Sequence, residues 1–406
     1  MNAVYRMIKH RINTGEFVGL RILKWYNKHM QKAYKYRIYP THRQATMLEQ
    51  CLDICCELYN GALQERRDAY KLVGISIGYS HQQNQLPEIK KTRTDLKQIH
   101  SQVLQDVLRR LDKAMDAFFR RVRVGQTPGY PRFRARSRYD SFTFTQSGFA
   151  IINGRLSLSK LGHIKIQLHR AMAGNIKTCT IKRNATGKWF AIFSCDIEAQ
   201  PLPASEKAVG GDVGLSSFTT LSDGRKIDNP KFLRAEEQAL AKAQQKLSVA
   251  AKGSQERKTR KRTVARVHER IANKRADFAH QESRKIINEF GIICIENLMI
   301  LNMMKNHCLA KSIADAAWSM FFHMLNYKAE WAGRIVEKVP PGHTTTDCHR
   351  CGNRRSDLTL ADRIYHCSNP ECLLQIDRDL NAALNILALG LQRLGLHPRE
   401  AAFLAC

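Results

Sequence analysis

The 406-residue sequence contains no uninterrupted run of about 20 apolar residues, the length that a helix needs to cross a lipid bilayer. Carboxylates are also scarce: 36 Asp and Glu stand against 66 Lys and Arg, and the formal net charge is +30. The first absence predicts that no transmembrane helix exists and that no membrane partner is needed. The second favours a polyanionic partner, above all nucleic acid, over a merely solvated basic surface.

The chain also lacks the uninterrupted apolar core of a secretory signal near its start, so we expect a reducing, cytoplasmic environment. The 12 cysteines therefore need not form disulfides. Six of them lie in apolar periodic segments and are typical of small core residues: Cys51, Cys55, Cys56, Cys179, Cys195 and Cys294. The length predicts two to four domains.

An aspartate stands inside an apolar segment that is predicted to form two short strands, residues 208–224. Asp212 follows Gly210 and Gly211 in the first of these strands and precedes Gly214. A carboxylate in such a place is costly unless it is paired or holds a cation, and glycines allow another backbone or a phosphate to approach. The alternative is a strand whose aspartate points to solvent.

Two later segments place further carboxylates at the ends of predicted elements. Residues 292–295 are apolar without alternation, as in a strand covered on both faces, and the run ends at Glu296. Asp377 and Asp379 open a predicted helix, where acidic residues can also act simply as partners of the helix dipole. Three carboxylates far apart in sequence suit a phosphodiesterase that binds two divalent ions, and oxygen ligands favour magnesium.

A cluster of cysteines precedes the last of these segments. The pairs Cys348/Cys351 and Cys367/Cys372 have the spacing of two loops that close one tetrahedral zinc site. Paired disulfides are the alternative. Because four thiolates leave no open position, the predicted zinc ion is structural.

The remaining segments alternate between helical and strand patterns. A strand is predicted for residues 33–39 and a helix with a Thr41/Gln44 capping box follows it. A second helix is predicted for residues 98–122, with residues 74–88 as a polar connection, and residues 141–198 read as closely spaced strands of a small barrel. A helical hairpin with a break at Gly253 follows residue 230, and a separate helix is predicted for 279–290.

Basic residues gather in two places that favour contact with a nucleic-acid backbone over a solvated surface. The loop 125–139 interleaves Arg132, Arg134 and Arg136 with aromatic residues, a pairing typical of RNA binding. The second arm of the hairpin is dense in charge and includes Lys258 and Arg262.

The order of these motifs resembles TnpB, a family of transposon-encoded, RNA-guided DNA endonucleases related to the type V CRISPR effectors. The resemblance rests on Gly-Gly-Asp-Val-Gly at 210–214, Ile-Glu-Asn-Leu at 295–298, the four-cysteine cluster and Asp-Arg-Asp-Leu-Asn at 377–381. It extends over about residues 30–389. It implies a RuvC-type, RNase H-like nuclease with Asp212, Glu296 and Asp379 as catalytic residues. The sequence departs from the family pattern at none of these three positions.

The resemblance also implies an α+β multidomain architecture: an RNase H-like (RuvC) nuclease with an inserted zinc ribbon, a β-barrel wedge domain and a helical recognition module. It implies a monomeric, cytoplasmic, nucleoid-associated prokaryotic protein that holds one guide RNA from the transposon end. The expected boundaries are an extension at 1–29, the wedge at 30–40 and 125–200, the recognition module at 41–124, the nuclease at 207–340 and 374–395, the ribbon at 341–373 and a tail at 396–406.

The expected DNA partner is a double-stranded target with a short adjacent motif. Alignment with the family places Gln105 where it could read that motif, although the same residue could contact only water, and Arg109 would bind the DNA backbone. The rival functions are a transposase that transfers DNA strands, a non-catalytic RNA-guided regulator, and a zinc-ribbon binding module on an inert scaffold.

Overall fold

The structure is a computed structural model that describes residues 29–198, 200–359 and 361–396. The chain divides into two compact units, an N-terminal unit of residues 29–197 and a C-terminal unit that begins at Glu198. The expected extension lies outside the described residues apart from position 29, as does the tail apart from residue 396. Within the described part of the chain, every helix is too short or too polar to cross a bilayer.

The N-terminal unit combines a seven-stranded sheet with a layer of helices. The order of its strands is β2-β6-β7-β1-β5-β4-β3. The rings of Phe144 on β2 and Phe149 on β3 have centroids 6.4 Å apart, so the two outer strands approach each other across an aromatic core. The strands are β1 (His29–Tyr39), β2 (Ser141–Phe144), β3 (Phe149–Ile152), β4 (Arg155–Leu158), β5 (Gly162–Gln167), β6 (Asn175–Arg183) and β7 (Trp189–Glu198).

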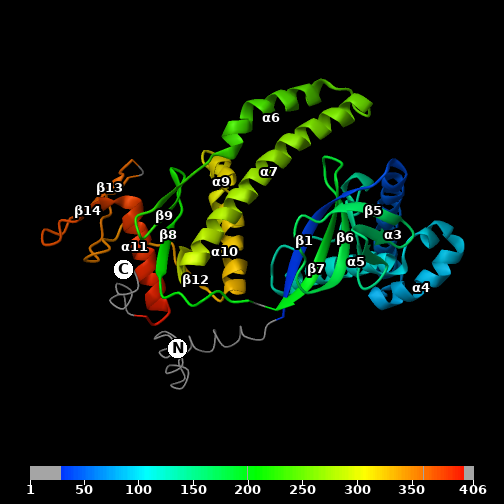
Figure 1. The fold of residues 1–406 in the computed structure, drawn as a ribbon, viewed down its shortest axis with the longest axis horizontal. Coiled ribbons are helices and arrows are strands. Elements are labelled where there is room, and N and C mark those ends of the chain that lie inside the picture. The colour runs from blue at the N-terminus through cyan, green and yellow to red at the C-terminus, as the bar shows by residue number, and fades with distance from the viewer. Residues whose placement is uncertain (1–28, 199, 360, 397–406) are drawn as a thin grey trace, which may run out of the picture. The chain divides into compact units, whose positions relative to one another are not determined.

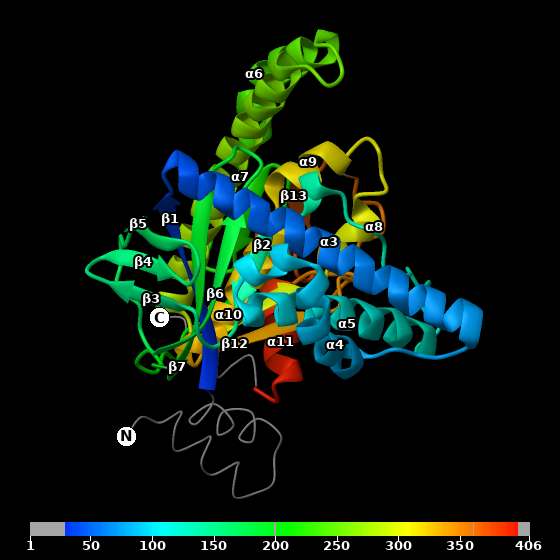
Figure 2. The same cartoon turned by 90° about the vertical axis from the view of Figure 1, so that its right-hand side faces the viewer.

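The helices of this unit pack side by side, as Figure 2 shows for α3, α4 and α5. The predicted capping box is confirmed: Thr41 and Gln44 exchange side-chain and backbone hydrogen bonds at the start of α3. The predicted polar connection at 74–88 is wrong, because most of it belongs to α4. The helices are α3 (His42–Val73), α4 (Tyr79–Thr92) and α5 (Ser101–Arg123), with 3₁₀ turns η1 (Thr94–Gln98) and η2 (Arg136–Arg138).

The buried face of α4 contains a polar side chain among few apolar ones, which explains why the helix is hard to recognise from the sequence. Gln82 is buried, accepts a hydrogen bond from Arg66 Nε at 2.8 Å and donates to the carbonyl of Ala62 at 2.9 Å. Only one apolar side chain of this helix, Leu86, is fully buried. A search for helical hydrophobic periodicity therefore finds too few positions.

The C-terminal unit contains a five-stranded sheet of order β10-β9-β8-β11-β12. β8 pairs antiparallel with β9 and parallel with β11, which pairs parallel with β12. A separate two-stranded sheet joins β13 and β14. The strands are β8 (Ala208–Asp212), β9 (Ser217–Leu221), β10 (Lys226–Asp228), β11 (Ile292–Glu296), β12 (Ile335–Val339), β13 (Ile364–His366) and β14 (Gln375–Asp377).

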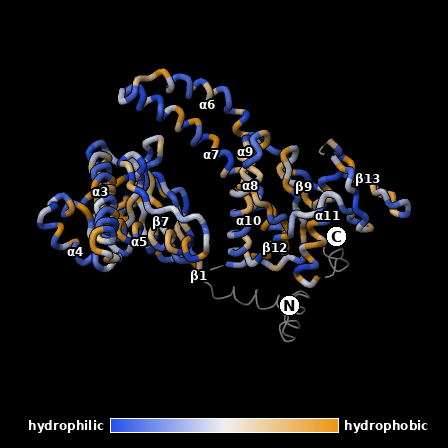
Figure 3. The backbone as a smooth tube through the Cα atoms, turned by 180° about the vertical axis from the view of Figure 1, so that it is seen from behind, coloured by the Kyte–Doolittle hydropathy of each residue, from blue (hydrophilic) through white to orange (hydrophobic). Residues whose placement is uncertain are grey.

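Helices cover both faces of this sheet, and a long helical hairpin extends from it. The helix predicted for 279–290 is the end of one continuous helix, α7, whose arm pairs with α6 and is hydrophilic over most of its length (Figure 3). Gly253, with φ +87°, lies at the predicted break. The helices are α6 (Phe232–Val249), α7 (Gln255–Glu289), α8 (Ile300–Met303), α9 (Ala310–Ala316), α10 (Trp318–Ala332) and α11 (Arg378–Arg393).

Candidate active site and cysteine centre

The register of β8 and β11 places two of the predicted carboxylates side by side. The strands are parallel, with Gly210 opposite Cys294 and Gly211 opposite Ile295, so the next positions are Asp212 and Glu296. Side chains alternate between the faces of a sheet. Asp212 therefore lies on the face of Gly210, and Glu296 on the face of Cys294. Val209, Ile293 and Ile295 belong to the core on the opposite face.

The face that carries the two carboxylates is covered by α11, which lies against β8 in Figure 1. The contact is so close that it requires glycine on both elements. A Cβ at Gly210 would meet the carbonyl oxygen of Ala383 at 2.1 Å, and a Cβ at Gly390 would meet Cys294 Sγ at 2.2 Å. The close packing fixes the position of the helix along the strands.

This packing brings the third carboxylate to the same end of the sheet. From the contact at Gly210, Asp212 lies two residues further along β8, about 7 Å at the rise of a strand. Asp379 lies one turn before Ala383 on α11, about 6 Å at the rise of a helix. Because the helix begins at the carboxyl end of β8, Asp379 in its first turn faces the ends of the two strands.

The electrostatics of Asp212 show that both other carboxylates act on this group. Burial raises the pKa of Asp212 well above its usual range, and the negative charges of Glu296 and Asp379 raise it further. Arg378 acts in the opposite direction but does not offset these effects. The free protein thus holds an excess of negative charge at this point, which a bound cation would relieve.

Glu296 has a hydrogen-bond partner from outside the sheet. Burial raises the pKa of Glu296, while the hydroxyl of Thr344, which donates to its Oε1 at 2.6 Å, lowers it in part. Thr344 itself is buried. This contact holds one oxygen of the carboxylate and leaves the other without a hydrogen bond among the described residues.

The structure distinguishes the two aspartates at the start of α11. Asp377 is the N-cap: its Oδ1 accepts from the backbone N–H groups of Asp379 and Leu380 at 3.1 Å. Its Oδ2 accepts from Lys226 Nζ at 2.6 Å. Asp379 has only a distant ion pair, 3.8 Å from Arg378 Nε. Asp377 is therefore occupied in holding the helix start, and Asp379 is the carboxylate left for a ligand.

Two asparagines one turn apart on α11 connect this site to the cysteine region. Asn385 donates from Nδ2 to the backbone carbonyls of Thr344 at 2.8 Å and Asp347 at 2.7 Å. Asn381 also donates to the carbonyl of Asp347, and its own oxygen accepts from the backbone N–H of His349 at 3.0 Å. The loop that supplies Thr344 is thereby fixed to the helix that supplies Asp379.

The four predicted cysteines converge, with thiol sulfurs all within 4.8 Å of one another. Cys348 Sγ lies 3.8 Å from Cys372 Sγ, and Cys351 Sγ lies 3.5 Å from Cys367 Sγ. The cysteines are free, which contradicts the disulfide alternative. With Zn–S bonds of about 2.3 Å, the edge of a regular tetrahedron is about 3.8 Å, so the set fits zinc. Buried Tyr365 and Leu374 pack beside it.

Among the described residues, the four cysteines are the one group of three or more such side chains that the structure brings close enough together to hold a metal ion. The three carboxylates do not form such a group in this structure.

The predicted nucleic-acid residues lie on several elements. On α5, Gln105 is half-buried and Arg109 lies over the ring of Tyr79 at 5.2 Å. Arg132, Arg134 and Arg136 are exposed, but Arg136 forms an ion pair with Glu57. Lys258 and Arg262 are exposed on α7. The first five of these residues belong to the N-terminal unit, and Lys258 and Arg262 belong to the C-terminal unit.

The sequence interpretation missed Thr344, Asn381 and Asn385. Asn381 ends the Asp-Arg-Asp-Leu-Asn motif and Asn385 follows one turn later, a spacing that indicates a shared polar face. Thr344 precedes the first cysteine by four residues in a run of three threonines, and nothing in that run singles it out. Its role depends on a loop conformation that local patterns do not specify.

Comparison with known families finds three matches along the chain. Residues 192–307 match a family described as "Probable transposase", residues 318–386 match the Cas12f1-like TNB domain, and residues 30–74 match a helix-turn-helix domain. In the structure, residues 30–74 form strand β1 and the single helix α3.

Curated relatives cover most of the chain. A protein of Streptomyces pristinaespiralis named "Putative RNA-guided DNA endonuclease" is 38% identical over 89% of this chain and 90% of its own length. The Escherichia coli K12 protein "Putative RNA-guided DNA endonuclease InsQ" is 30% identical over 88% of this chain and 92% of its own length.

The fold also resembles a solved structure. The protein of a Cas12f1–sgRNA–target DNA complex aligns with a TM-score of 0.57 at 13% identity, over 88% of this chain and 98% of that one. This likeness concerns the fold alone. The identities and coverage of the curated relatives show that the chain belongs to the TnpB family.

Proposed function

We propose that this protein is an RNA-guided DNA endonuclease that hydrolyses phosphodiester bonds with one magnesium-dependent site. The observation that carries the proposal is the meeting of Asp212, Glu296 and Asp379 at the ends of β8 and β11 and the start of α11. Family membership, with relatives named for this activity, supports it.

The residues of the site divide into ligands and supports. Asp212, Glu296 and Asp379 would hold two divalent ions, for which carboxylate oxygens are suitable ligands. When bound, such ions activate a water for attack and stabilise the charge on the leaving oxygen. Thr344 orients Glu296, and Asp377 with Lys226 holds the helix start that presents Asp379.

We infer that the C-terminal unit has an RNase H-like (RuvC) fold, supported by its mixed sheet and by carboxylates at the ends of parallel strands. The cysteine cluster would bind a structural zinc ion, because four thiolates leave no position for a substrate. The sheet of the N-terminal unit, with its aromatic core, would serve as the wedge β-barrel, and α3–α5 as the recognition module.

The proposed partners are one guide RNA for each protein monomer and a double-stranded DNA target with a short adjacent motif. The net charge of +30 supports polyanionic partners. Arg132, Arg134, Lys258 and Arg262 are exposed and available for phosphates. Gln105 and Arg109 lie on the same helix, as reading of a DNA motif by α5 requires.

The decisive experiment exchanges the guide. The RNA that copurifies with the protein is sequenced, its guide segment is replaced, and the reconstituted complex is incubated with two plasmids in magnesium buffer. Cleavage should follow the guide from the old target to the new one. Cleavage of both plasmids regardless of guide would reject RNA guidance.

The match to a family described as a probable transposase gives strand transfer as the second candidate. The same acidic triad could serve both reactions. Products of the guide-exchange assay separate them, since hydrolysis leaves free ends with 5′-phosphates, whereas strand transfer joins a cut end to a second DNA. Binding without either product would instead identify a regulator.

A further inference from the structure

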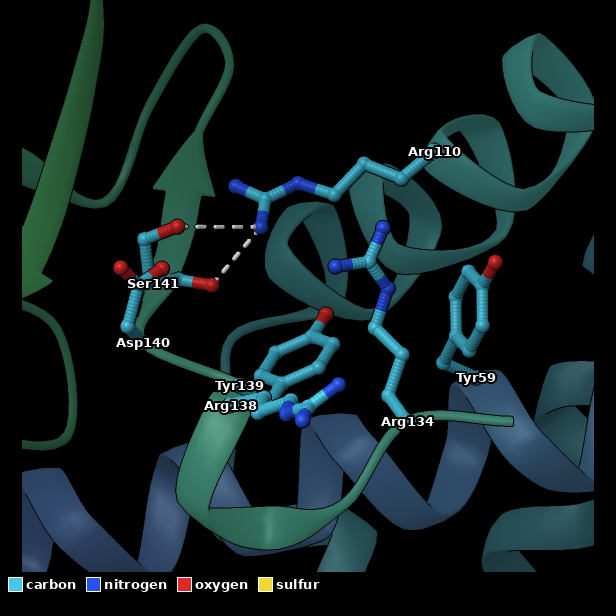
Figure 4. A pocket seen from close by; sticks show the side chains of 7 residues that line it. All are labelled: Tyr59, Arg110, Arg134, Arg138, Tyr139, Asp140 and Ser141. Carbon is cyan, nitrogen blue, oxygen red and sulfur yellow. Dashed lines mark hydrogen bonds between the residues drawn. The ribbon is translucent and has the colours of Figure 1, made fainter. Parts of the chain in front are cut away.

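A small cavity in the N-terminal unit is lined by three arginines and two tyrosines (Figure 4). Arg110 comes from α5, Tyr59 from α3, and Arg134, Arg138 and Tyr139 from the segment that leads into β2. Its volume is about 150 Å³. Pockets for drug-sized ligands span roughly 300–1,000 Å³, so this cavity would hold one phosphate-sized group rather than a whole nucleotide.

Two sets of hydrogen bonds make the walls of the cavity rigid. Asn60 on α3 accepts from the backbone N–H of Arg134 at 2.8 Å and donates to its carbonyl at 2.9 Å. Arg110 donates to the carbonyl of Ser141 and the hydroxyl of Thr143, both at 2.7 Å. The cationic groups are thus attached to a backbone that is already held in place, which reduces the entropy lost on binding.

The charge around the cavity is only partly balanced. Asp106 accepts from Arg110 at 2.7 Å. Asp140, the acidic residue of the lining, forms an ion pair with Lys182 at 3.3 Å. Arg134 and Arg138 have no carboxylate partner within the described ranges, although Arg134 lies over the ring of Tyr59 at 5.3 Å. Two arginine charges therefore remain available to an anion.

The hydroxyl of Tyr139 provides an independent sign of a ligand. Tyr139 is 4% exposed, and its oxygen is buried without a hydrogen-bond partner in the described part of the chain. Figure 4 shows this hydroxyl directed toward the side chains of Arg110 and Arg134. Burial raises the pKa of Tyr139, so the group remains a protonated donor. An unpartnered buried hydroxyl is costly, and an acceptor in the cavity would remove that cost.

We propose that this cavity binds one phosphodiester group of a nucleic-acid strand, with Arg134, Arg138 and Tyr139 as its ligands. The phosphate could come from the guide RNA or from the target DNA, and the inference rests on the proposed function for the identity of these strands. Guanidinium groups and a hydroxyl are donors that match the oxygens of a phosphate.

The test uses the full chain and four variants, each measured with two probes. The probes are the copurifying RNA, transcribed in vitro, and a target DNA duplex offered to the RNA-loaded complex. Tyr139→Phe removes only the hydroxyl and should weaken binding of one probe by about 10-fold, as expected for a hydrogen bond to a charged group. Arg138→Gln should lower the slope of log affinity against log salt by about 0.7–0.9, the value for one phosphate contact.

Tyr79→Phe is the matched control, because the hydroxyl of Tyr79 is also buried without a partner but does not line the cavity. It should leave both affinities unchanged. Both tyrosine variants should unfold at the same temperature as the wild type or higher, since each loses an unsatisfied group. If Tyr139→Phe does not fold, the test relies on Arg138→Gln and Arg134→Gln, because the side chains of both arginines are exposed and their replacement should not disturb folding.

Loss confined to the RNA probe assigns the phosphate to the guide, and loss confined to the DNA probe assigns it to the target. Unchanged affinity of Tyr139→Phe for both probes, together with an unchanged salt slope for Arg138→Gln, would overturn the proposal. These are binding measurements, so a chain that binds its RNA but cuts nothing would contradict the proposed function and leave this test intact.

Discussion

The two clusters of the C-terminal unit that are proposed to bind ions differ in how the chain assembles them. The cysteine cluster comes from two loops between residues 348 and 372, whereas the carboxylates come from positions 212, 296 and 379 on three separate elements. The first is compact and closed; the second lies at element ends, where burial and, after it, like charges raise the pKa of Asp212. Local spacing thus specifies the proposed zinc site, whereas the register of a sheet specifies the proposed catalytic site.

Removal of the carboxylates should have the largest effect on cleavage. Asp212→Ala, Glu296→Ala and Asp379→Ala should each lower the cleavage rate by at least about 1,000-fold, since each would remove a ligand that contributes several kcal/mol to transition-state stabilisation. Affinity for RNA and DNA should change little. Asp377→Asn is the control, because Asn also caps helices and the triad remains. Loss of cleavage in Asp377→Asn with normal rates in Asp379→Ala would reverse their assignment.

Loss of the cysteine cluster should destabilise the C-terminal unit and also disturb the positions of the carboxylates. Cys348→Ser or Cys372→Ser should release about one zinc ion per chain and lower the melting temperature of the C-terminal unit. Cleavage should fall as well, because Asn381 and Asn385 hold the adjoining loop. Elemental analysis and calorimetry measure these effects, with Cys308→Ser, an exposed cysteine outside the cluster, as control. Freshly purified protein without zinc would refute the assignment.

Thr344 connects the two clusters, so its replacement tests whether they act together. Thr344→Val should lower the cleavage rate by about 10-fold, the usual effect of losing an outer partner of a metal ligand. Thr344→Ser keeps the hydroxyl and should retain most of the activity. Equal rates in both variants and the wild type would mean that the hydrogen bond to Glu296 has no part in positioning it.

The smallest expected effect concerns stability in magnesium-free buffer. A carboxyl group whose folded pKa is raised binds its proton more tightly in the native state, so its contribution to stability falls as pH rises from about 4 through that raised value. Asp212→Asn removes this penalty. The variant should melt at a higher temperature than the wild type, by a margin that grows with pH. A margin that is absent or constant across pH would contradict the raised pKa of Asp212.

Much of this arrangement could be predicted from the sequence, but for different reasons in each part. The cysteine cluster, the Thr41 capping box and the hairpin break at Gly253 depend on neighbouring residues, and the structure confirms them. The identity of the triad came from a family resemblance. That Asp212 and Glu296 share a face depends on the parallel register of β8 and β11, which no local pattern specifies.

The features that the sequence did not predict also depend on contacts between residues far apart in the chain. Helix α4 was missed because Gln82, which is held by partners from α3, interrupts its sparse apolar face. The role of Thr344 depends on the loop that Asn385 fixes from a helix 41 residues later. In both cases a polar side chain forms a hydrogen bond with a residue far away in the sequence, and such contacts leave no periodic pattern in the sequence.

The most direct test of the central claim is the location of divalent ions. Crystals of the RNA-bound protein, grown with Mn²⁺ in place of magnesium, are measured at the manganese absorption edge. Two anomalous peaks about 3.5–4 Å apart should appear among Asp212, Glu296 and Asp379, and none should appear there in Asp212→Ala. Manganese bound elsewhere, with these three carboxylates empty at saturating concentration, would contradict it.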